Sequence, residues 1–212
     1  SNLANWSTKT SNKITRPVME MLLKIDKEAE LPKFYKKTLI DQIDVNKQTT
    51  KKDKGKVIIF PTCFVNYNNP ELGLLTKKIL DKLEIYNEFF YNSCCGMPQL
   101  EGGDIESVSQ KALDTSLKLK NFIDEGYTIL SIVPSCTLML KFEWPLLLPN
   151  NKDVKRLGEN TKDICEFLVE NITDENKHFL KPVDKENNVS LHISCHSRAQ
   201  NIGQKATELL RL

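Results

Sequence analysis

The adjacent thiols Cys94 and Cys95 are the part of this sequence best suited to chemistry. They stand in the segment Ser93–Pro98, which reads SCCGMP. The glycine and the proline predict a tight turn that holds both sulfurs at the surface. A core strand or helix would direct two neighbouring side chains apart. We therefore expect the two sulfurs to act together.

Two single cysteines, Cys63 and Cys136, each follow an apolar run that predicts a strand. The runs read VIIFPT at 57–62 and ILSIVPS at 129–135. If both are neighbouring strands of one parallel sheet, their carboxyl ends lie at the edge where ligands bind in open α/β folds. The four thiols would then converge, and such soft donors select iron-sulfur clusters, zinc or copper. Four unrelated buried cysteines are the alternative interpretation.

Strand and helix patterns alternate from residue 56 onward. Apolar runs predict strands at 57–60, 85–91 and 128–133. Leucines and isoleucines at helical spacing predict helices over 72–83 and 104–124, the second with Asp104 as its N-cap. This order predicts an α/β fold, in which helices flank a parallel sheet with right-handed crossovers.

Composition narrows the class of protein. The chain has 212 residues, 40% hydrophobic and 27% charged, enough for one domain and an appendage. Its net charge of +2 predicts no nucleic-acid partner. The longest apolar run, 138–148, is broken by Lys141, Glu143 and Pro145, which excludes a membrane span. With no secretory signal, the six cysteines predict a cytoplasmic protein with bound metal rather than disulfides.

Residues 1–55 have the pattern of an N-terminal arm and linker. Thr15–Pro17 opens a short helix with a stripe of methionine and leucine, which we expect to pack against the main domain. Docking on a membrane surface or on a partner protein is the alternative. The polar segment Gln48–Gly55 is expected to be a solvated linker.

The last residues repeat the first strand and helix. Residues 189–195 again predict a strand that ends in a cysteine, Cys195, and the apolar pairs that follow repeat at an offset of 130 residues. We therefore divide the chain into a first cysteine-rich module at 56–172, a connector at 173–188 and the start of a second, truncated module at 189–212. Since the chain begins with serine and stops within a helical pattern, we interpret the chain as a fragment of a longer protein.

Two further sites carry weaker signals. Cys165 stands among apolar residues of a helix expected over 160–170, so we interpret it as a core residue. His196 follows Cys195 and could lower its pKa or act as a ligand, although a turn histidine bonded to the backbone is the commoner case. The bulky segment Phe142–Pro145 is interpreted as a lid over apolar core.

The cysteine spacing resembles that of the CCG-type cysteine-rich domain family. In this family a single cysteine, a Cys-Cys-Gly motif and a final cysteine motif follow in order. Here 30 residues separate Cys63 from Cys94, and 40 separate Cys95 from Cys136. The domain is found in the B subunit of heterodisulfide reductase, in lactate-utilisation iron-sulfur proteins and in the C subunit of anaerobic glycerol-3-phosphate dehydrogenase. Over about residues 13–212 the chain looks most like the last group, as in CFVNYN at 63–68 and PSCT at 134–137.

The resemblance implies a set of cluster ligands. An iron-sulfur cluster of 4Fe-4S type, cubane or noncubane, would be bound by Cys63, Cys94, Cys95 and Cys136, with Cys195 as a further ligand from the second module. Met139 stands where the heterodisulfide reductase pattern has its last cysteine. A noncubane cluster with five thiolates would therefore lack one ligand here.

Three functions follow. The resemblance implies an iron-sulfur electron-transfer subunit that relays electrons from a flavoprotein dehydrogenase, or another redox protein, toward quinone, with contact to the cytoplasmic face of the membrane left open. The first alternative is a disulfide reductase with a catalytic cluster. The second is a zinc-binding module without redox activity, although adjacent cysteines fit the usual zinc spacing poorly.

Overall fold

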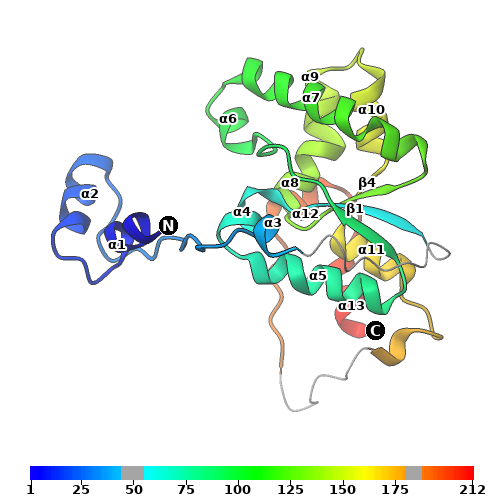
Figure 1. The fold of residues 1–212 in the computed structure, drawn as a ribbon, viewed down its shortest axis with the longest axis horizontal. Coiled ribbons are helices and arrows are strands. Elements are labelled where there is room, and N and C mark those ends of the chain that lie inside the picture. Colours follow the sequence, from blue (N-terminus) through cyan, green and yellow to red (C-terminus); the bar gives the residue numbers. More distant parts are fainter. Residues whose placement is uncertain (44–54, 180–187) are drawn as a thin grey trace.

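The computed structural model describes residues 1–43, 55–179 and 188–212 (Figure 1). The predicted linker Gln48–Gly55 lies outside these ranges except for Gly55, and so does the 180–187 part of the predicted connector. Among the residues in these ranges, no helix is both long and apolar enough to cross a bilayer.

A four-stranded parallel sheet forms the centre of the molecule, in the order β2-β1-β3-β4. The strands are β1 (Lys56–Phe60), β2 (Tyr86–Phe89), β3 (Thr128–Ser131) and β4 (Thr161–Asp163). Strand β1 lies between β2 and β3, so the chain adds β2 on one side and then crosses to the other. The switch of direction falls between β1 and β3, and in open α/β sheets ligands bind at such a point.

Helices cover both faces of this sheet. Along β1, Val57 and Ile59 face one core, and Ile58 and Phe60 face the other; all four are fully buried. The first core includes side chains of α5 (Pro70–Lys82) and α11 (Ile164–Asn171). The second includes side chains of α7 (Ile105–Asp124) and α10 (Lys152–Glu159). This alternation is the period of two that a strand buried on both faces requires.

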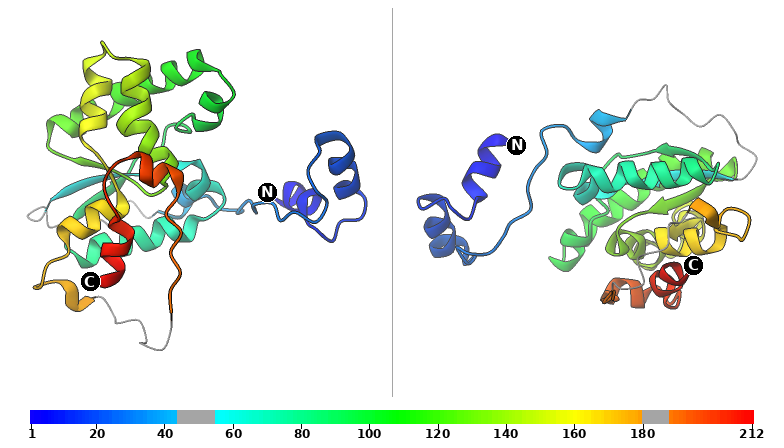
Figure 2. Two further views of the ribbon diagram at one scale, coloured as in Figure 1. Left: turned by 180° about the vertical axis from the view of Figure 1, so that it is seen from behind. Right: turned by 90° about the horizontal axis from the view of Figure 1, so that it is seen from below.

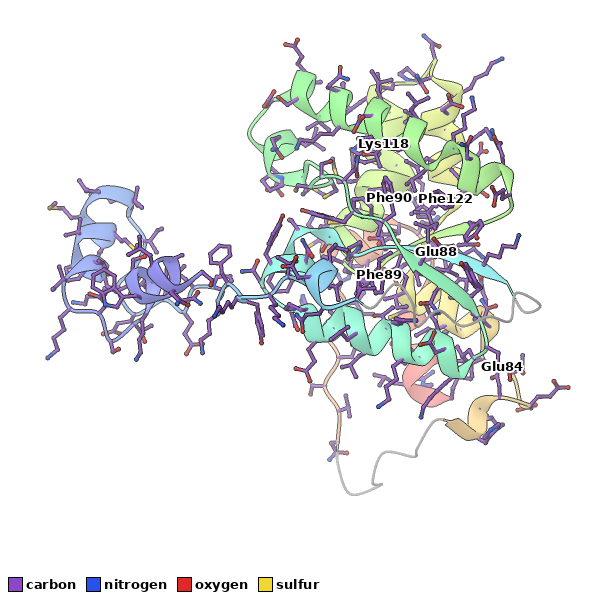
Figure 3. All side chains as sticks on the ribbon, viewed as in Figure 1. Glu84, Glu88, Phe89, Phe90, Lys118 and Phe122 are labelled. Carbon is purple, nitrogen blue, oxygen red and sulfur yellow. The ribbon has the colours of Figure 1, made fainter. Side chains whose placement is uncertain are left out.

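The aromatic side chains around β2 follow the same division. Phe89 lies on the α5 side of the sheet, whereas Phe90 and Phe122 lie on the α7 side (Figure 3). The remaining helices of the body are α3 (Leu39–Gln42), α4 (Thr62–Tyr67), α6 (Met97–Glu101), α8 (Pro134–Leu138), α9 (Trp144–Leu147), α12 (Cys195–Ala199) and α13 (Lys205–Arg211), with a 3-10 turn at Lys177–Phe179.

The prediction of an α/β fold with a parallel sheet flanked by helices is confirmed. Helix α7 begins where predicted, because the Asp104 carboxylate accepts the Ser107 N–H at 3.2 Å. The helix expected over 160–170 begins later. The Asp163 side chain caps it by accepting the Cys165 N–H at 2.8 Å. The three residues before Ile164 pair with β3 as strand β4, which the sequence pattern did not indicate.

The strand predicted at 189–195 is wrong. Residues 188–194 have no regular secondary structure, and Cys195 begins helix α12. Val189 is 60% exposed and Leu191 is 43% exposed, so the apolar alternation of this segment covers no core. A strand needs a neighbour to bond its backbone groups, and within the described ranges this segment has none. The duplication of the module therefore stays a prediction.

The N-terminal arm stands apart from the body. Its helices α1 (Asn2–Thr8) and α2 (Thr15–Leu23) pack on each other, away from the sheet (Figures 1 and 2). The methionine and leucine stripe of α2 is exposed, with Met21 at 65% and Leu22 at 67%, so the prediction that it packs against the main domain is wrong. Arg16 stabilises the arm internally instead, because its buried guanidinium donates to the carbonyls of Asp26 and Lys27 at 2.8 and 3.0 Å.

A short segment at 33–43 attaches the arm to the body. Leu39 is fully buried and lies against Gly73 of α5, where a Cβ would come within 2.3 Å of the leucine side chain. The backbone N–H of Tyr35 donates to the carbonyl of Tyr67 at 2.9 Å. The N–H of Ile40 donates to the buried side-chain oxygen of Asn66 at 3.1 Å.

A π-helical turn, η1 (Met139–Glu143), joins α8 to α9. The N–H of Trp144 donates to the carbonyl of Met139, five residues earlier. Pro145 has no N–H to give to the Lys141 carbonyl, which leaves that carbonyl outside the usual i to i−4 ladder. Helix α10 packs directly against this turn at Gly158. A Cβ at Gly158 would lie 2.9 Å from the Lys141 carbonyl oxygen.

We expect Gly158→Ala to lower the free energy of unfolding by about 1–2 kcal/mol, because a methyl group against a backbone oxygen forces the two segments apart. This change in the free energy of unfolding has the opposite sign to the change at an exposed helical glycine, where alanine adds about 1 kcal/mol of stability. Urea denaturation measures the change. Glu159→Ala, on the exposed side of the same helix, serves as the control and should stay within about 0.5 kcal/mol. An unchanged midpoint for Gly158→Ala would contradict this packing.

Candidate functional site

The structure brings four cysteines together at the carboxyl edge of the sheet. Cys63 lies in α4 directly after β1, Cys136 lies in α8 after β3, and Cys94 and Cys95 lie in the turn between β2 and α6. The Cys63 and Cys94 sulfurs are 3.6 Å apart, and the Cys95 and Cys136 sulfurs are 3.1 Å apart. Cysteines as far apart in the chain as positions 63 and 136 thus meet at the switch point of the sheet.

The four thiols differ in burial. Cys95 and Cys136 are only 2% and 5% exposed and belong to the core on the α7 side, whereas Cys63 and Cys94 are partly exposed. The prediction that both thiols of the pair lie at the surface is therefore wrong for Cys95. The first thiol of the pair is partly exposed and packs against the edge of this core, whereas the second lies within it. All six cysteines of the chain are free thiols.

Two backbone positions with positive φ form the turns that carry these sulfurs. Gly96 has φ 89°, and a Cβ there would lie 3.3 Å from the Val108 side chain, so glycine lets α7 cover the turn closely. Thr62 has φ 72° and is fully buried. A positive φ is strained for a β-branched residue, and such strain is typical of functional sites. The Thr62 hydroxyl accepts the Val65 N–H at 3.3 Å, which ties the turn to α4.

Hydrogen bonding between the sulfurs lowers the pKa of the Cys94 thiol. The pKa of Cys94 is lowered first by the bond from the Cys63 thiol and then by the bond from the Cys95 thiol. The Gly96 N–H and the charge of Lys111 lower it further. Cys94 therefore holds negative charge more readily than Cys63 or Cys95.

Two other thiols of the site, Cys63 and Cys95, have pKa values raised above the ordinary value. The pKa of Cys63 is raised, first by its hydrogen bond to Cys94 and then by burial. The pKa of Cys95 is raised, first by its hydrogen bond to Cys136 and then by its bond to Cys94 and by burial. Backbone amides also reach the sulfurs, because the N–H of Phe64 bonds Cys63 and that of Met97 bonds Cys95.

The four sulfurs form a chain of thiol contacts rather than a shell around one point. Across the described ranges, no group of three or more histidine, cysteine, aspartate or glutamate side chains is arranged to hold a single metal ion. Protonated thiols bond one another, and ligation requires thiolates. The donor set itself, four sulfurs from three neighbouring loops with amide donors beside them, fits an iron-sulfur cluster.

The remaining cysteines, both within the described ranges, form no sulfur–sulfur hydrogen bond with this set. Cys165 is in α11, partly exposed, and its pKa is raised to about 11, first by burial and then by the charge of Asp163. Cys195 is exposed at the start of α12. Helix α12 packs on α8, and Gln200 beside it donates to the Pro134 carbonyl at 3.2 Å. The roles predicted for Cys195 and His196 stay predictions.

Sequence reasoning missed the aromatic residues that line the site. Trp144 is fully buried, and its indole N–H donates to the carbonyl of Cys95 at 3.0 Å. The ring of Tyr91 lies 6.0 Å from that of Tyr67 in an edge-to-face arrangement, beside Cys63 and Cys94. The sequence alone indicates no more than a lid at Trp144 and its neighbours. The bond to Cys95 could not be expected from the sequence, because it depends on the π-helical turn.

Comparison with known proteins confirms the expected family resemblance. Residues 57–141 match the profile of the CCG family, described as a cysteine-rich domain. The chain is similar to the C subunit of anaerobic glycerol-3-phosphate dehydrogenase from Escherichia coli (strain K12), with 27% identity over 207 residues that cover 97% of this chain and 51% of that protein. It is also similar to lactate utilization protein A of Bacillus pumilus, with 28% identity over 151 residues that cover 66% of this chain and 58% of that protein.

Lactate utilization protein A of Bacillus subtilis (strain 168) is 27% identical over 161 residues, which cover 73% of this chain and 64% of that protein. The chain thus spans about half the length, 51%, of the glycerol-3-phosphate dehydrogenase proteins that it matches. No solved structure gave a significant match. The matched range 57–141 includes Cys63, Cys94, Cys95 and Cys136, and it leaves Cys165 and Cys195 outside.

We expect Cys165 to react slowly with iodoacetamide at pH 8. Its pKa, raised from 9.0 to about 11, leaves about 100-fold less thiolate than an ordinary cysteine has. Mass spectrometry of the alkylated peptides measures the rate. Cys195 is the exposed reference, and urea should remove most of the difference. Cys165 is partly exposed and belongs to neither core, so the interpretation as a core residue is not confirmed. Equal rates for Cys165 and Cys195 in the folded protein would contradict the raised pKa of Cys165.

Proposed function

We propose that this chain, whose residues 57–141 match the CCG cysteine-rich domain, binds an iron-sulfur cluster and acts in an electron-transfer subunit of an oxidoreductase. The observation that carries the proposal is the meeting of four thiols, two of them buried, at the switch point of a parallel sheet. Soft sulfur donors without nearby histidine or carboxylate ligands favour iron-sulfur clusters over harder metal ions. The proposed ligands are Cys63, Cys94, Cys95 and Cys136.

The residues around the thiols would set the properties of a bound cluster. Such a cluster accepts and donates single electrons, at a potential that depends on hydrogen bonds to sulfur and on solvent exposure. The amides of Phe64, Gly96 and Met97 donate to the sulfurs and stabilise negative charge on them. The partly exposed side of the site, at Cys63 and Cys94, is where an electron could enter or leave.

Two alternatives have less support. A disulfide reductase with a five-thiolate cluster would need a cysteine thiolate at position 139, where Met139 offers only a thioether and is fully buried in the apolar core. A zinc site with adjacent ligands would depart from the usual spacing of two to four residues between cysteines.

Within the proposal, the cluster held by the four cysteines is of the 4Fe-4S type.

The partners belong to the proposal as well. Similarity to the C subunit of a dehydrogenase supports a complex with a flavoprotein dehydrogenase, which would deliver electrons for transfer toward quinone. Similarity to lactate utilization protein A supports a second class of electron donor. We place the protein in the cytoplasm and propose that Cys195 belongs to a second cysteine-rich module that starts at residue 189.

Anaerobic purification with iron and sulfide analysis tests the cluster directly, and we expect both elements together with visible absorption. Cys95→Ser should weaken cluster binding by about 10- to 100-fold or more, because it replaces a soft ligand at the buried end of the site. The loss should appear as bleached visible absorption and a changed EPR signal. Cys165→Ser is the matched control and should leave both unchanged. Zinc without iron or sulfide in the unaltered protein would refute the proposal.

A further inference from the structure

We infer that Trp144 is a positioning residue for the thiol site, which holds the Cys95 turn opposite the Cys136 thiol. Two contacts carry the inference. The fully buried Trp144 donates its indole N–H to the Cys95 carbonyl at 3.0 Å, and the Cys136 sulfur lies 3.1 Å from the Cys95 sulfur. Residue 95 is thus held at its backbone and at its side chain by the same helical segment, 134–147.

The π-helical turn η1 explains how one segment reaches residue 95 twice. Cys136 and Trp144 are eight residues apart, and in a regular α-helix eight steps of about 100° leave two side chains about 80° apart around the axis. A π-turn accommodates one extra residue, so the pair behaves like residues seven apart, about 20° from alignment. The turn at Met139–Glu143 therefore rotates Trp144 onto the face that carries Cys136.

Helix α10 keeps this rotated arrangement in place. Gly158 lies against the carbonyls of Leu140 and Lys141, at distances that leave no room for a Cβ. The Lys141 ammonium pairs with Glu166 of α11 at 2.8 Å, which holds the π-turn from a second side. The position of the indole is therefore fixed by packing that does not involve the thiols.

Loss of the indole N–H should loosen the Cys95 turn. The carbonyl of a residue that is only 2% exposed would lose a partner that water replaces poorly. A buried hydrogen bond of this kind corresponds to a shift of roughly 5- to 30-fold in the equilibrium between closed and open turn. The inference rests on the proposed function in one respect only, namely that the positioned thiols are cluster ligands.

The first experiment uses the metal-free protein and measures alkylation of Cys95 by iodoacetamide with mass spectrometry. The chain has two tryptophans, so a Trp6→Phe background, altered in the exposed arm, leaves Trp144 as the single tryptophan. In this background we expect Trp144→Phe to label Cys95 roughly 5- to 30-fold faster, with Cys165 unchanged. L-Benzothienylalanine at position 144 keeps the two-ring shape of tryptophan and removes only the N–H. If Trp144→Phe fails to fold, the alkylation rate of Cys95 in this second variant tests the role of the N–H.

The second experiment reconstitutes each variant with iron and sulfide and records EPR spectra. If Trp144 positions a ligand, the benzothienylalanine variant should show a changed EPR line shape while the Trp6→Phe background matches the unaltered protein. If the unaltered protein takes up no iron and sulfide, the proposed function fails, and the alkylation rates alone judge the positioning role. Unchanged alkylation of Cys95 in the benzothienylalanine variant overturns the inference.

Discussion

The site depends on one constraint of parallel sheets, namely that neighbouring strands all end at the same edge. Strands β1, β2 and β3 are adjacent, and each is followed within a few residues by a cysteine of the site. The residues between these strands form covering helices that return the chain to the opposite edge. Sulfurs as distant in sequence as Cys63 and Cys136 are thereby brought to one place, without a dedicated metal-binding loop. The sheet is the scaffold, and the loops after its strands carry the chemistry.

Burial divides the site into an inner and an outer half. Cys95 and Cys136 are enclosed by the core on the α7 side, whereas Cys63 and Cys94 are partly exposed. The hydrogen bonds of Cys95 to Cys136 and Cys94, and then burial, raise the pKa of the inner Cys95, whereas hydrogen bonds from neighbouring thiols lower the pKa of the outer Cys94. This polarity suits a relay, because a bound redox group would be shielded on one side and reachable on the other.

The body and the arm are stabilised by different interactions. The body buries apolar side chains on both faces of its sheet, whereas the arm buries Arg16 and satisfies it with backbone carbonyls. The apolar stripe of α2 is exposed to solvent and takes no part in this packing. Leu39 and the bonds to Tyr67 and Asn66 attach it close to Cys63, since both partners lie in α4.

The α/β class, the strands β1, β2 and β3, the helix α7 and the set of four thiols could be predicted from the sequence, because each depends on local patterns of apolar residues and on the rule that parallel strands share an edge. Other features depend on residues far apart in the chain. The backbone of residues 161–163 pairs with β3 while the Asp163 carboxylate caps α11. Within the described ranges residues 188–194 have no strand partner, and Cys95 is buried in the core on the α7 side. The bond from Trp144 to Cys95 follows a π-turn that directly precedes Trp144 and packs against Gly158 of a separate helix. Such contacts arise from three-dimensional packing, on which the spacing of residues along the chain carries no information.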